Sequence, residues 1–413
     1  MALPSEIDIA IIGAGAAGLG AAFALQGAGR SVIILEARDR IGGRGHTILA
    51  APDIPFDVGC EWLHSADRNS FVGIATSLGA AIDRSRGSWR DHAYDVGFSA
   101  QAHAAFYEAQ DAFYARVEAA AGLPQDTAAS DWLEPGNPWN PLIDAISTYI
   151  NGCELDLVSS HDTAAYEDSD INWRLQSGYG ALIAAYGAPC PVALNTAVTL
   201  IDHSGPRIKL VTSQGTLAAA KVIVTVPTSL IAEEAIRFDP PLPDKVEAAR
   251  GLPLGVAEKV MLALDEPPQA HHALPIDGHL RGATNRVGTG SYDLRPRGLP
   301  VISGFFGGRF AQELIAQGGD ALAQAAIDEL VGLLGSDYRK RLRPLAQSRW
   351  VQDPFARGSY SHALPGHAGA RAVLAAPVDG RLLFAGEATS PNFFSTAHGA
   401  RDSGTRAARQ ALG

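Results

Sequence analysis

The feature that most constrains the fold is an apolar segment, residues 7–12, that runs directly into the turn G-A-G-A-A-G at residues 13–18. An alanine-rich stretch follows, which predicts a strand, a tight turn and a helix in succession. Gly13 permits the turn, Gly15 lets a pyrophosphate approach the backbone, and Gly18 lets the helix pack closely on the strand. We therefore expect the N-terminus of the helix to face the phosphates of a dinucleotide.

A second apolar segment, residues 32–35, ends at Glu36, where a carboxylate can accept hydrogen bonds from ribose hydroxyls. The chain continues to Gly43 and Arg44; the glycine exposes backbone amides, and the guanidinium can form two parallel hydrogen bonds with phosphate oxygens. The sequence therefore predicts a dinucleotide cofactor. The residues predicted to hold it here are Gly13, Ala14, Gly15, Ala17, Gly18, Glu36, Ala37, Arg38, Gly43 and Arg44.

Residues 36–44 resemble the FAD signature of the flavin-dependent amine oxidases. The C-terminal region agrees: residues 381–389 resemble the strand and turn whose acid contacts the ribityl and phosphate region of the flavin. Residues 392–400 resemble the start of the helix beside the isoalloxazine ring. The resemblance is greatest to the spermine and acetylpolyamine oxidase branch.

This resemblance implies an α/β fold: a Rossmann-like FAD-binding domain with an interleaved α+β substrate-binding domain, as in the amine oxidase and glutathione-reductase-like FAD folds. The predicted FAD-binding domain comprises residues 1–75, 190–265 and 369–413, and the substrate-binding domain residues 76–189 and 266–368. Patterning predicts helices near residues 100–121 and 320–334 and a small β-meander over residues 192–226.

The resemblance also implies further contacts with the flavin. They are Gly59, Glu61, Trp62, Val198, Trp350, Gly386, Glu387 and Thr396. Ser359 stands where the monoamine oxidases have a cysteine bonded to the flavin. A serine cannot form that thioether, so the resemblance predicts noncovalent FAD.

Three residues are predicted to be catalytic. Lys259 matches the amine oxidase lysine that hydrogen-bonds a water at flavin N5, and the alternative is a surface lysine on an edge strand. His64 lies in a tryptophan-x-histidine segment and could hold a substrate nitrogen or take a proton, or make only a structural hydrogen bond. Tyr360 supplies one aromatic wall for the amine, and the facing position is Thr396, so the aromatic cage of the monoamine oxidases is incomplete.

The predicted substrate-binding residues are His64, Glu167, Tyr360, Phe394 and Thr396. Acidic residues gather between positions 154 and 170, where they either attract distal ammonium groups or form a solvated surface. The net charge of -11 is compatible with a cationic substrate and argues against nucleic acid as a partner.

The resulting hypothesis is an FAD-dependent oxidase of a polyamine or related amine. Hydride passes from carbon to flavin N5, the imine hydrolyses to aldehyde and amine, and O2 is reduced to H2O2. The first alternative is a carbon–carbon desaturase or protoporphyrinogen-oxidase-like dehydrogenase, against which Lys259 and the S-T-A-H-G-A segment speak. The second is a noncatalytic flavin-binding protein.

Three widely spaced cysteines, Cys60, Cys153 and Cys190, suggest neither a disulfide framework nor a metal site, so we expect a reducing, cytoplasmic location. The opening residues lack the basic region of a signal peptide. No apolar run reaches the roughly 18 residues of a membrane span, and no membrane partner is expected. The sequence leaves open whether the chain forms a homodimer.

Overall fold

The computed structural model describes residues 3–91, 96–265 and 274–413, and an eight-stranded sheet holds its N-terminal segment. The strand order is β11-β8-β9-β10-β1-β2-β7, with β17 beside the C-terminal half of β10. The strands are β1 (Glu6–Ile12), β2 (Val32–Leu35), β7 (Val192–Ala193), β8 (Val198–Asp202), β9 (Ile208–Thr212), β10 (Gly215–Val224), β11 (Arg237–Asp239) and β17 (Leu382–Phe384). β1 pairs in parallel with both β2 and β10, as expected for apolar strands buried on both faces.

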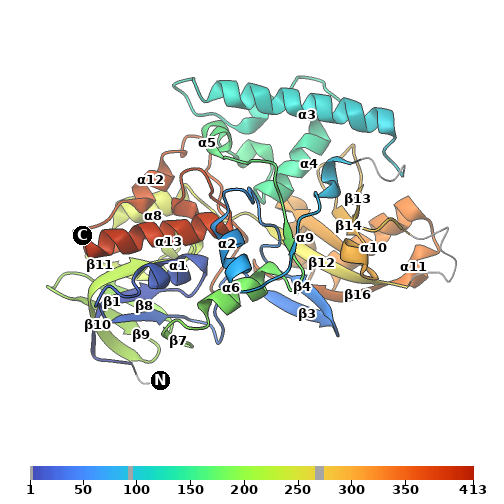
Figure 1. The fold of residues 1–413 in the computed structure, drawn as a ribbon. Helices are drawn as coiled ribbons and strands as arrows, with labels where there is room; N and C mark the ends of the chain where they lie inside the picture. Colours follow the sequence, from blue (N-terminus) through green and yellow to red (C-terminus); the bar gives the residue numbers. More distant parts are fainter. Residues whose placement is uncertain (1–2, 92–95, 266–273) are drawn as a thin grey trace.

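Two helices from opposite ends of the chain, α1 (Ala16–Ala24) and α13 (Ala397–Leu412), pack side by side against this sheet (Figure 1). A Cβ on Gly404 would lie 1.9 Å from the carbonyl oxygen of Ala17, and one on Gly20 would lie 2.5 Å from that of Arg401. Glycine at these two positions therefore permits the close contact that joins the C-terminus to the glycine turn. The sheet is further covered by α7 (Thr228–Ala232), α8 (Pro243–Arg250) and α12 (Ala370–Ala375).

A second, antiparallel sheet has the order β13-β14-β15-β12-β16. Its strands are β12 (Ala257–Leu264), β13 (Gly278–Arg281), β14 (Ser291–Leu294), β15 (Val301–Gly307) and β16 (Leu342–Gln347). Leu262, Tyr292 and Ile302 project from one face into a core with α9 (Gly308–Gln317), α10 (Ala321–Leu334) and α11 (Tyr338–Arg341). Because side chains alternate along a strand, the positions between them face the other way.

The remaining elements lie outside these two sheets. They are α2 (Ser70–Ser77), α3 (Ala100–Ala120), α4 (Asn140–Ile150), α5 (Ser160–Ala165), α6 (Tyr179–Gly187), β3 (Thr47–Ala51), β4 (Ile54–Asp57), β5 (Ile82–Asp83), β6 (Arg174–Leu175) and the short 3-10 helices η1 (Ser88–Arg90), η2 (Ala129–Trp132), η3 (Leu155–Leu157), η5 (Pro296–Gly298) and η6 (Glu387–Thr389). Figure 1 shows α3 as a long helix along one side of the molecule, next to α4 and α5.

The two predicted helices are confirmed as α3 and α10, and the predicted meander as β8, β9 and β10. The domain boundaries stay a prediction, with one difference. Residues 257–264, predicted within the FAD-binding domain, form β12 between β15 and β16 of the second sheet. The reason is that β12 supplies Val260 and Leu262 to the core beneath α10. Over the described residues, none of the helices is both long enough and apolar enough to span a bilayer.

Candidate functional site

A cavity of about 980 Å³ is lined by residues of both sheets. From the first sheet come the ends of β1, β2 and β10, represented by Gly13, Glu36 and Thr225. From the second sheet comes one face, which includes Lys259 and Phe305. The cavity therefore joins the predicted dinucleotide site to the predicted catalytic lysine.

The glycine turn adopts the conformation that the sequence predicts. Gly13 has φ 103°, and its N–H donates to the carbonyl of Leu35 at 2.8 Å. Gly18 is packed so tightly that a Cβ there would lie 1.9 Å from the carbonyl oxygen of Gly13. Gly13, Gly15 and Ala17 line the cavity, whereas Ala14 and Gly18 support the turn from behind. No side chain caps α1, and its first two residues line the cavity, so its first backbone N–H groups are available to a phosphate there.

Glu36 lies at the end of β2 with 3% of its surface exposed. Its two carboxylate oxygens accept from the backbone N–H groups of Ala14, at 2.7 Å, and Arg38, at 2.9 Å. Ala37 and Arg38 also line the cavity, and Arg38 donates to Asp353 at 2.6 Å. Glu36 thus fixes the turn and also presents a carboxylate to the cavity.

The backbone at Gly15 and Gly43 forms a cradle that a dinucleotide fits. A Cβ on Gly43 would lie 3.1 Å from the Cα of Gly15, so a side chain there would crowd the turn. Arg44 also lines the cavity, where its Nη1 donates to the carbonyl of Ser359 at 2.6 Å and to Glu387 at 3.0 Å. The glycines, the acid and the guanidinium therefore fit the charge and shape of FAD, whose direct contacts with these residues stay a prediction.

The other predicted cofactor residues also line the cavity. They are Gly59, Glu61, Trp62, Val198, Trp350, Gly386, Glu387 and Thr396. Trp350 is held by an Nε1–H hydrogen bond to the carbonyl of Val58 at 2.6 Å. Gly59 leaves room for the neighbouring turn, since a Cβ there would lie 1.6 Å from the carbonyl oxygen of Arg44.

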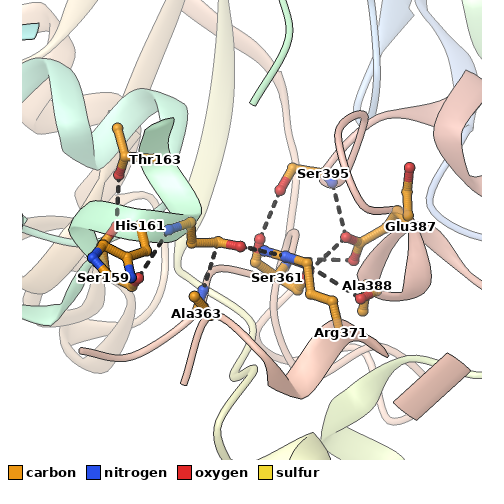
Figure 2. A network of polar contacts seen from close by, with 12 residues as sticks. Ser159, His161, Thr163, Ser361, Ala363, Arg371, Glu387, Ala388 and Ser395 are labelled. Atoms are coloured by element: carbon orange, nitrogen blue, oxygen red, sulfur yellow. Dashed lines mark hydrogen bonds and ion pairs between the residues drawn. The ribbon is translucent and has the colours of Figure 1, made fainter. Parts of the chain in front are cut away.

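Glu387 is the centre of a buried polar network (Figure 2). It accepts from the hydroxyl of Ser361 at 2.6 Å and from the N–H of Ser395 at 2.9 Å. Burial alone would raise the pKa of Glu387, but Arg44, Ser361 and Arg371 outweigh it, and the pKa falls below its ordinary value. Arg371 continues the network to Asp162 through two hydrogen bonds of 2.6 and 2.7 Å. Glu387 is therefore an ionised acid held in one orientation.

His362 lies next to this network, and its lowered pKa predicts that the folded protein loses stability in acid. Burial and the charge of Arg371 lower the pKa of His362 from 6.5 to about 4. Above pH 6.5 the imidazole is neutral in both states; below it the unfolded chain binds a proton that the folded chain does not, so stability falls towards pH 4. At pH 5 this costs on the order of 2 kcal/mol. Urea unfolding at pH 7 and pH 5 should show a smaller loss for His362→Gln than for wild type; equal losses would contradict the assignment.

Lys259 lies in the interior of the second sheet, which excludes the alternative of a surface lysine on an edge strand. Its Nζ donates to Glu61 at 2.9 Å and to the carbonyl of Asp57 at 3.2 Å, and lies 5.7 Å from the ring centre of Phe305. Burial alone would lower the pKa of Lys259, but Glu61 outweighs it, and the pKa rises. Lys259 is therefore a fixed positive charge facing the cavity.

His64 also lines the cavity, and its Nδ1 lies 2.6 Å from Oδ1 of Asn172. Because a carbonyl oxygen only accepts, this contact places the proton on Nδ1 and leaves Nε2 as an acceptor. Burial lowers the pKa of His64, although Asp168 and Asn172 oppose the shift. A neutral imidazole with a free acceptor suits a substrate N–H.

Tyr360 donates its hydroxyl to the carbonyl of Tyr149, and burial raises the pKa of Tyr360. The phenol therefore stays protonated and contributes a ring to the cavity wall. Phe394 also lines the cavity, between the ring of Tyr166, 5.3 Å away, and the guanidinium of Arg371, 3.7 Å away. These two predicted substrate residues are brought together in one cavity.

Two predicted substrate residues have other structural partners. Thr396 lines the cavity but caps α13, accepting from the N–H of Gly399 at 3.0 Å. Glu167 is not among the cavity-lining residues; it pairs with Arg68 at 2.7 Å and accepts from Asn392. Its predicted contact with substrate therefore has no support in the geometry.

The sequence did not single out several side chains that line the cavity. They include Trp89, Tyr107, Tyr149, Asn172, His279, Arg281, Ser291, Asp293 and Phe305. The strands β13 and β14 alternate polar and apolar residues, a signal that indicates which positions share a face but not what the face lines. In the described parts of the chain, no group of three or more His, Cys, Asp or Glu side chains could hold a metal ion.

Comparisons with known proteins agree with this geometry. The sequence profile of the family described as flavin containing amine oxidoreductase matches residues 16–123 and 133–412. Polyamine oxidase 4 of Oryza sativa subsp. japonica is 29% identical, over 98% of this chain and 88% of the relative.

Two solved structures have a similar fold. Putrescine oxidase bound to putrescine gives a TM-score of 0.79 at 20% identity, covering 98% of each chain. Cyclohexylamine oxidase from Brevibacterium oxydans gives 0.78 at 23% identity, covering 99% of each chain. These likenesses confirm the predicted fold class.

Proposed function

Since the chain belongs to the family of flavin-containing amine oxidoreductases, we propose that it oxidises a carbon–nitrogen bond of a polyamine or a related amine. The protein is an FAD-dependent amine oxidoreductase. The observation that carries the finer proposal is one cavity that contains both the dinucleotide cradle and Lys259, His64 and Tyr360. A rice relative named polyamine oxidase supports the substrate class.

When bound, FAD supplies the acceptor for a hydride from the carbon next to nitrogen. The substrate becomes an imine; water adds to it, and the carbon–nitrogen bond breaks to give an aldehyde and an amine. The two electrons and two protons pass to O2, which gives H2O2.

The protein's own side chains prepare the amine for this reaction. The rings of Tyr149, Phe305 and Tyr360 provide apolar walls, which exclude water and disfavour a charged nitrogen. Nε2 of His64 accepts a hydrogen bond from the amine and holds it, or accepts its proton. The ammonium of Lys259 holds a water at the end of the cavity where the hydrolysis and the reaction with oxygen take place.

The FAD is proposed to be noncovalent, because Ser359, at the position of the flavin-bound cysteine, donates its hydroxyl to the carbonyl of Gly255 at 2.8 Å. We also propose a cytoplasmic location, supported by the absence of disulfides among Cys60, Cys153 and Cys190. Whether the chain forms a homodimer is tested by its mass in solution.

We expect activity to rise from pH 6 to pH 9. Hydride leaves readily only from a neutral amine, and deprotonating an amine of pKa 10.4 costs roughly 4 to 5 kcal/mol at pH 7. The apolar walls reduce this cost without abolishing it. The measurement is the rate of flavin bleaching by saturating amine in stopped flow, and a flat profile over this range would count against the proposal.

The decisive test is anaerobic mixing of the FAD-loaded protein with polyamines and simple monoamines while the flavin absorbance is followed. Bleaching by an amine, and recovery when air is admitted, would support amine oxidation and identify the substrate. If a folded, fully loaded protein stays oxidised with every amine, the proposal fails and carbon–carbon dehydrogenation becomes the leading hypothesis.

A further inference from the structure

A row of four side chains crosses the cavity-facing surface of the second sheet. Lys259 on β12 pairs in register with Phe305 on β15, Phe305 with Ser291 on β14, and Ser291 with Arg281 on β13. All four line the cavity. The strand register therefore places a second cation, Arg281, on the same surface as the predicted catalytic lysine.

The spacing of this row follows from sheet geometry. Neighbouring strands are about 4.8 Å apart, so three steps separate the Cα atoms of Lys259 and Arg281 by roughly 14 Å. The strands are held by ladder hydrogen bonds, which makes the separation a fixed length. It suits a ligand whose reacting end lies near Lys259 and whose far end lies near Arg281.

Arg281 is bound to the protein by neutral groups. Its Nη2 donates to the hydroxyl of Tyr107 at 2.7 Å and to the carbonyl of Trp89 at 3.2 Å. The guanidinium also lies 5.4 Å from the ring centre of Phe106. Within residues 3–91, 96–265 and 274–413, neither Nε nor Nη1 of Arg281 has a hydrogen-bond partner, and no carboxylate pairs with the guanidinium. Three N–H donors and a full positive charge therefore stay available to a ligand.

The nearby charged groups already have partners of their own. Asp293, the diagonal neighbour of Arg281, lies 3.2 Å from Nδ1 of His279. Burial lowers the pKa of His279, so this contact is a hydrogen bond from a neutral imidazole and Asp293 keeps its negative charge. Arg90, which also lines the cavity, pairs with Asp111 at 2.8 Å. At the other end of the row, Glu61 pairs with Lys259. Arg281 is thus the member of this row whose positive charge an incoming anion would pair with.

We propose that Arg281 binds a carboxylate at the far end of the substrate, so that the preferred substrate is an ω-amino acid with a straight apolar chain. The proposal rests on the proposed amine oxidation and selects within it, because a second ammonium at this end would face the guanidinium. The carbon chain of the substrate packs along Phe305 and Ser291, between its two polar ends. Arginine suits this role because its planar N–H groups match both oxygens of a carboxylate.

The length of the chain can be estimated. With the two side chains taken as parallel, about 3 Å between Arg281 and the carboxylate and about 3 Å between Lys259 and its water leave roughly 8 Å for the ligand. An extended chain covers about 1.2 Å per bond, so roughly seven bonds separate the nitrogen from the carboxylate carbon. This length corresponds to chains between 6-aminohexanoate and 8-aminooctanoate.

The test compares 8-aminooctanoate, octylamine and 1,8-diaminooctane as substrates of the FAD-loaded enzyme. We expect kcat/KM to be ~10- to 100-fold higher for 8-aminooctanoate than for the other two, as for a hydrogen-bonded charge pair. Arg281→Gln should bring the ratio of kcat/KM for 8-aminooctanoate to kcat/KM for octylamine close to one. Arg286 is exposed and lies outside the cavity lining. Arg286→Gln is therefore the control and should keep the preference for 8-aminooctanoate. A preference for the diamine, or an equal preference in Arg281→Gln, would overturn the proposal.

Structural damage from the lost hydrogen bonds to Tyr107 and Trp89 would slow 8-aminooctanoate and octylamine equally. The ratio of their kcat/KM values therefore separates loss of carboxylate recognition from structural damage. A second readout does not need turnover: octanoate should perturb the flavin spectrum of wild type at a ~10-fold or more lower concentration than that of Arg281→Gln. If no amine reduces the flavin, the proposed function fails, while octanoate binding still decides the role of Arg281. Equal binding of octanoate by both proteins would overturn it.

Discussion

Lys259→Met is expected to slow recovery of the oxidised flavin by oxygen by about 100-fold or more, because it removes a positioned charged donor from the cavity. Methionine preserves the length and apolar stem of the side chain while it removes the ammonium. The Nζ of Lys259 is fixed by Glu61 at 2.9 Å and by the carbonyl of Asp57 at 3.2 Å, so no other group can take its place without rearrangement. The measurement is stopped-flow mixing of the amine-reduced protein with oxygenated buffer.

Two variants make this prediction specific. Lys209→Met removes a lysine from the exposed surface of β9 and should leave the recovery rate unchanged. Glu61→Gln keeps the shape of the partner but removes its charge, so burial would then lower the pKa of Lys259. The rate of flavin reoxidation in Glu61→Gln should therefore fall as the pH rises, at pH values where the rate of the wild type is unchanged. A recovery rate in Lys259→Met within threefold of wild type would contradict the role of the ammonium.

The parts of the site that were predicted from sequence are those that depend on local backbone chemistry. Gly13 and Gly18 lie a few residues apart, and their roles follow from one turn and its contact with the following helix. Glu36 follows directly from the end of a strand. The C-terminal segment around Glu387 was found through family resemblance, because nothing local indicates that it meets Arg44 across the fold.

The row from Lys259 to Arg281 could not be predicted in the same way. Alternation along β13 shows that His279 and Arg281 share a face, but their neighbours depend on the register of four strands. A shift of one residue in one strand would turn Arg281 away from the cavity. Register is decided by the packing of Leu280 and Tyr292 against the helices behind the sheet, which is a long-range property.

The acidic residues between positions 154 and 170 illustrate the same limit. Sequence proximity suggested either a site for distal ammonium groups or one solvated surface, but the fold divides these residues between the two. Asp162, Asp168 and Asp170 line the cavity, whereas Asp156 and Glu167 do not. Asp156 pairs with Arg309, Glu167 with Arg68, and Asp162 with the buried Arg371. Whether such a carboxylate is solvated or part of the core depends on its arginine partner, which is far away in the sequence.

The buried ion pair of Arg371 with Asp162 carries the largest expected effect on stability. Arg371→Met should lower the free energy of unfolding by about 3 to 5 kcal/mol. The side chains of Arg371 and Asp162 are each 4% exposed. Removing the arginine leaves a buried carboxylate whose remaining backbone donor is the N–H of Ala363, at 3.1 Å. It also removes a charge that holds down the pKa of Glu387, so the affinity for FAD should fall most in acid.

Urea unfolding of the FAD-free protein at pH 7 measures the effect. Arg339→Met, in an ion pair whose side chains are 51% and 55% exposed, is the matched control and should change stability by less than about 1 kcal/mol. The double variant Asp162→Leu with Arg371→Met should recover much of the loss, because no unpaired charge is then buried. If Arg371→Met and Arg339→Met lose equal stability, the buried pair does not hold the segment before η6 against α5, and the geometry of Glu387 must be maintained by Ser361 and Ser395 alone.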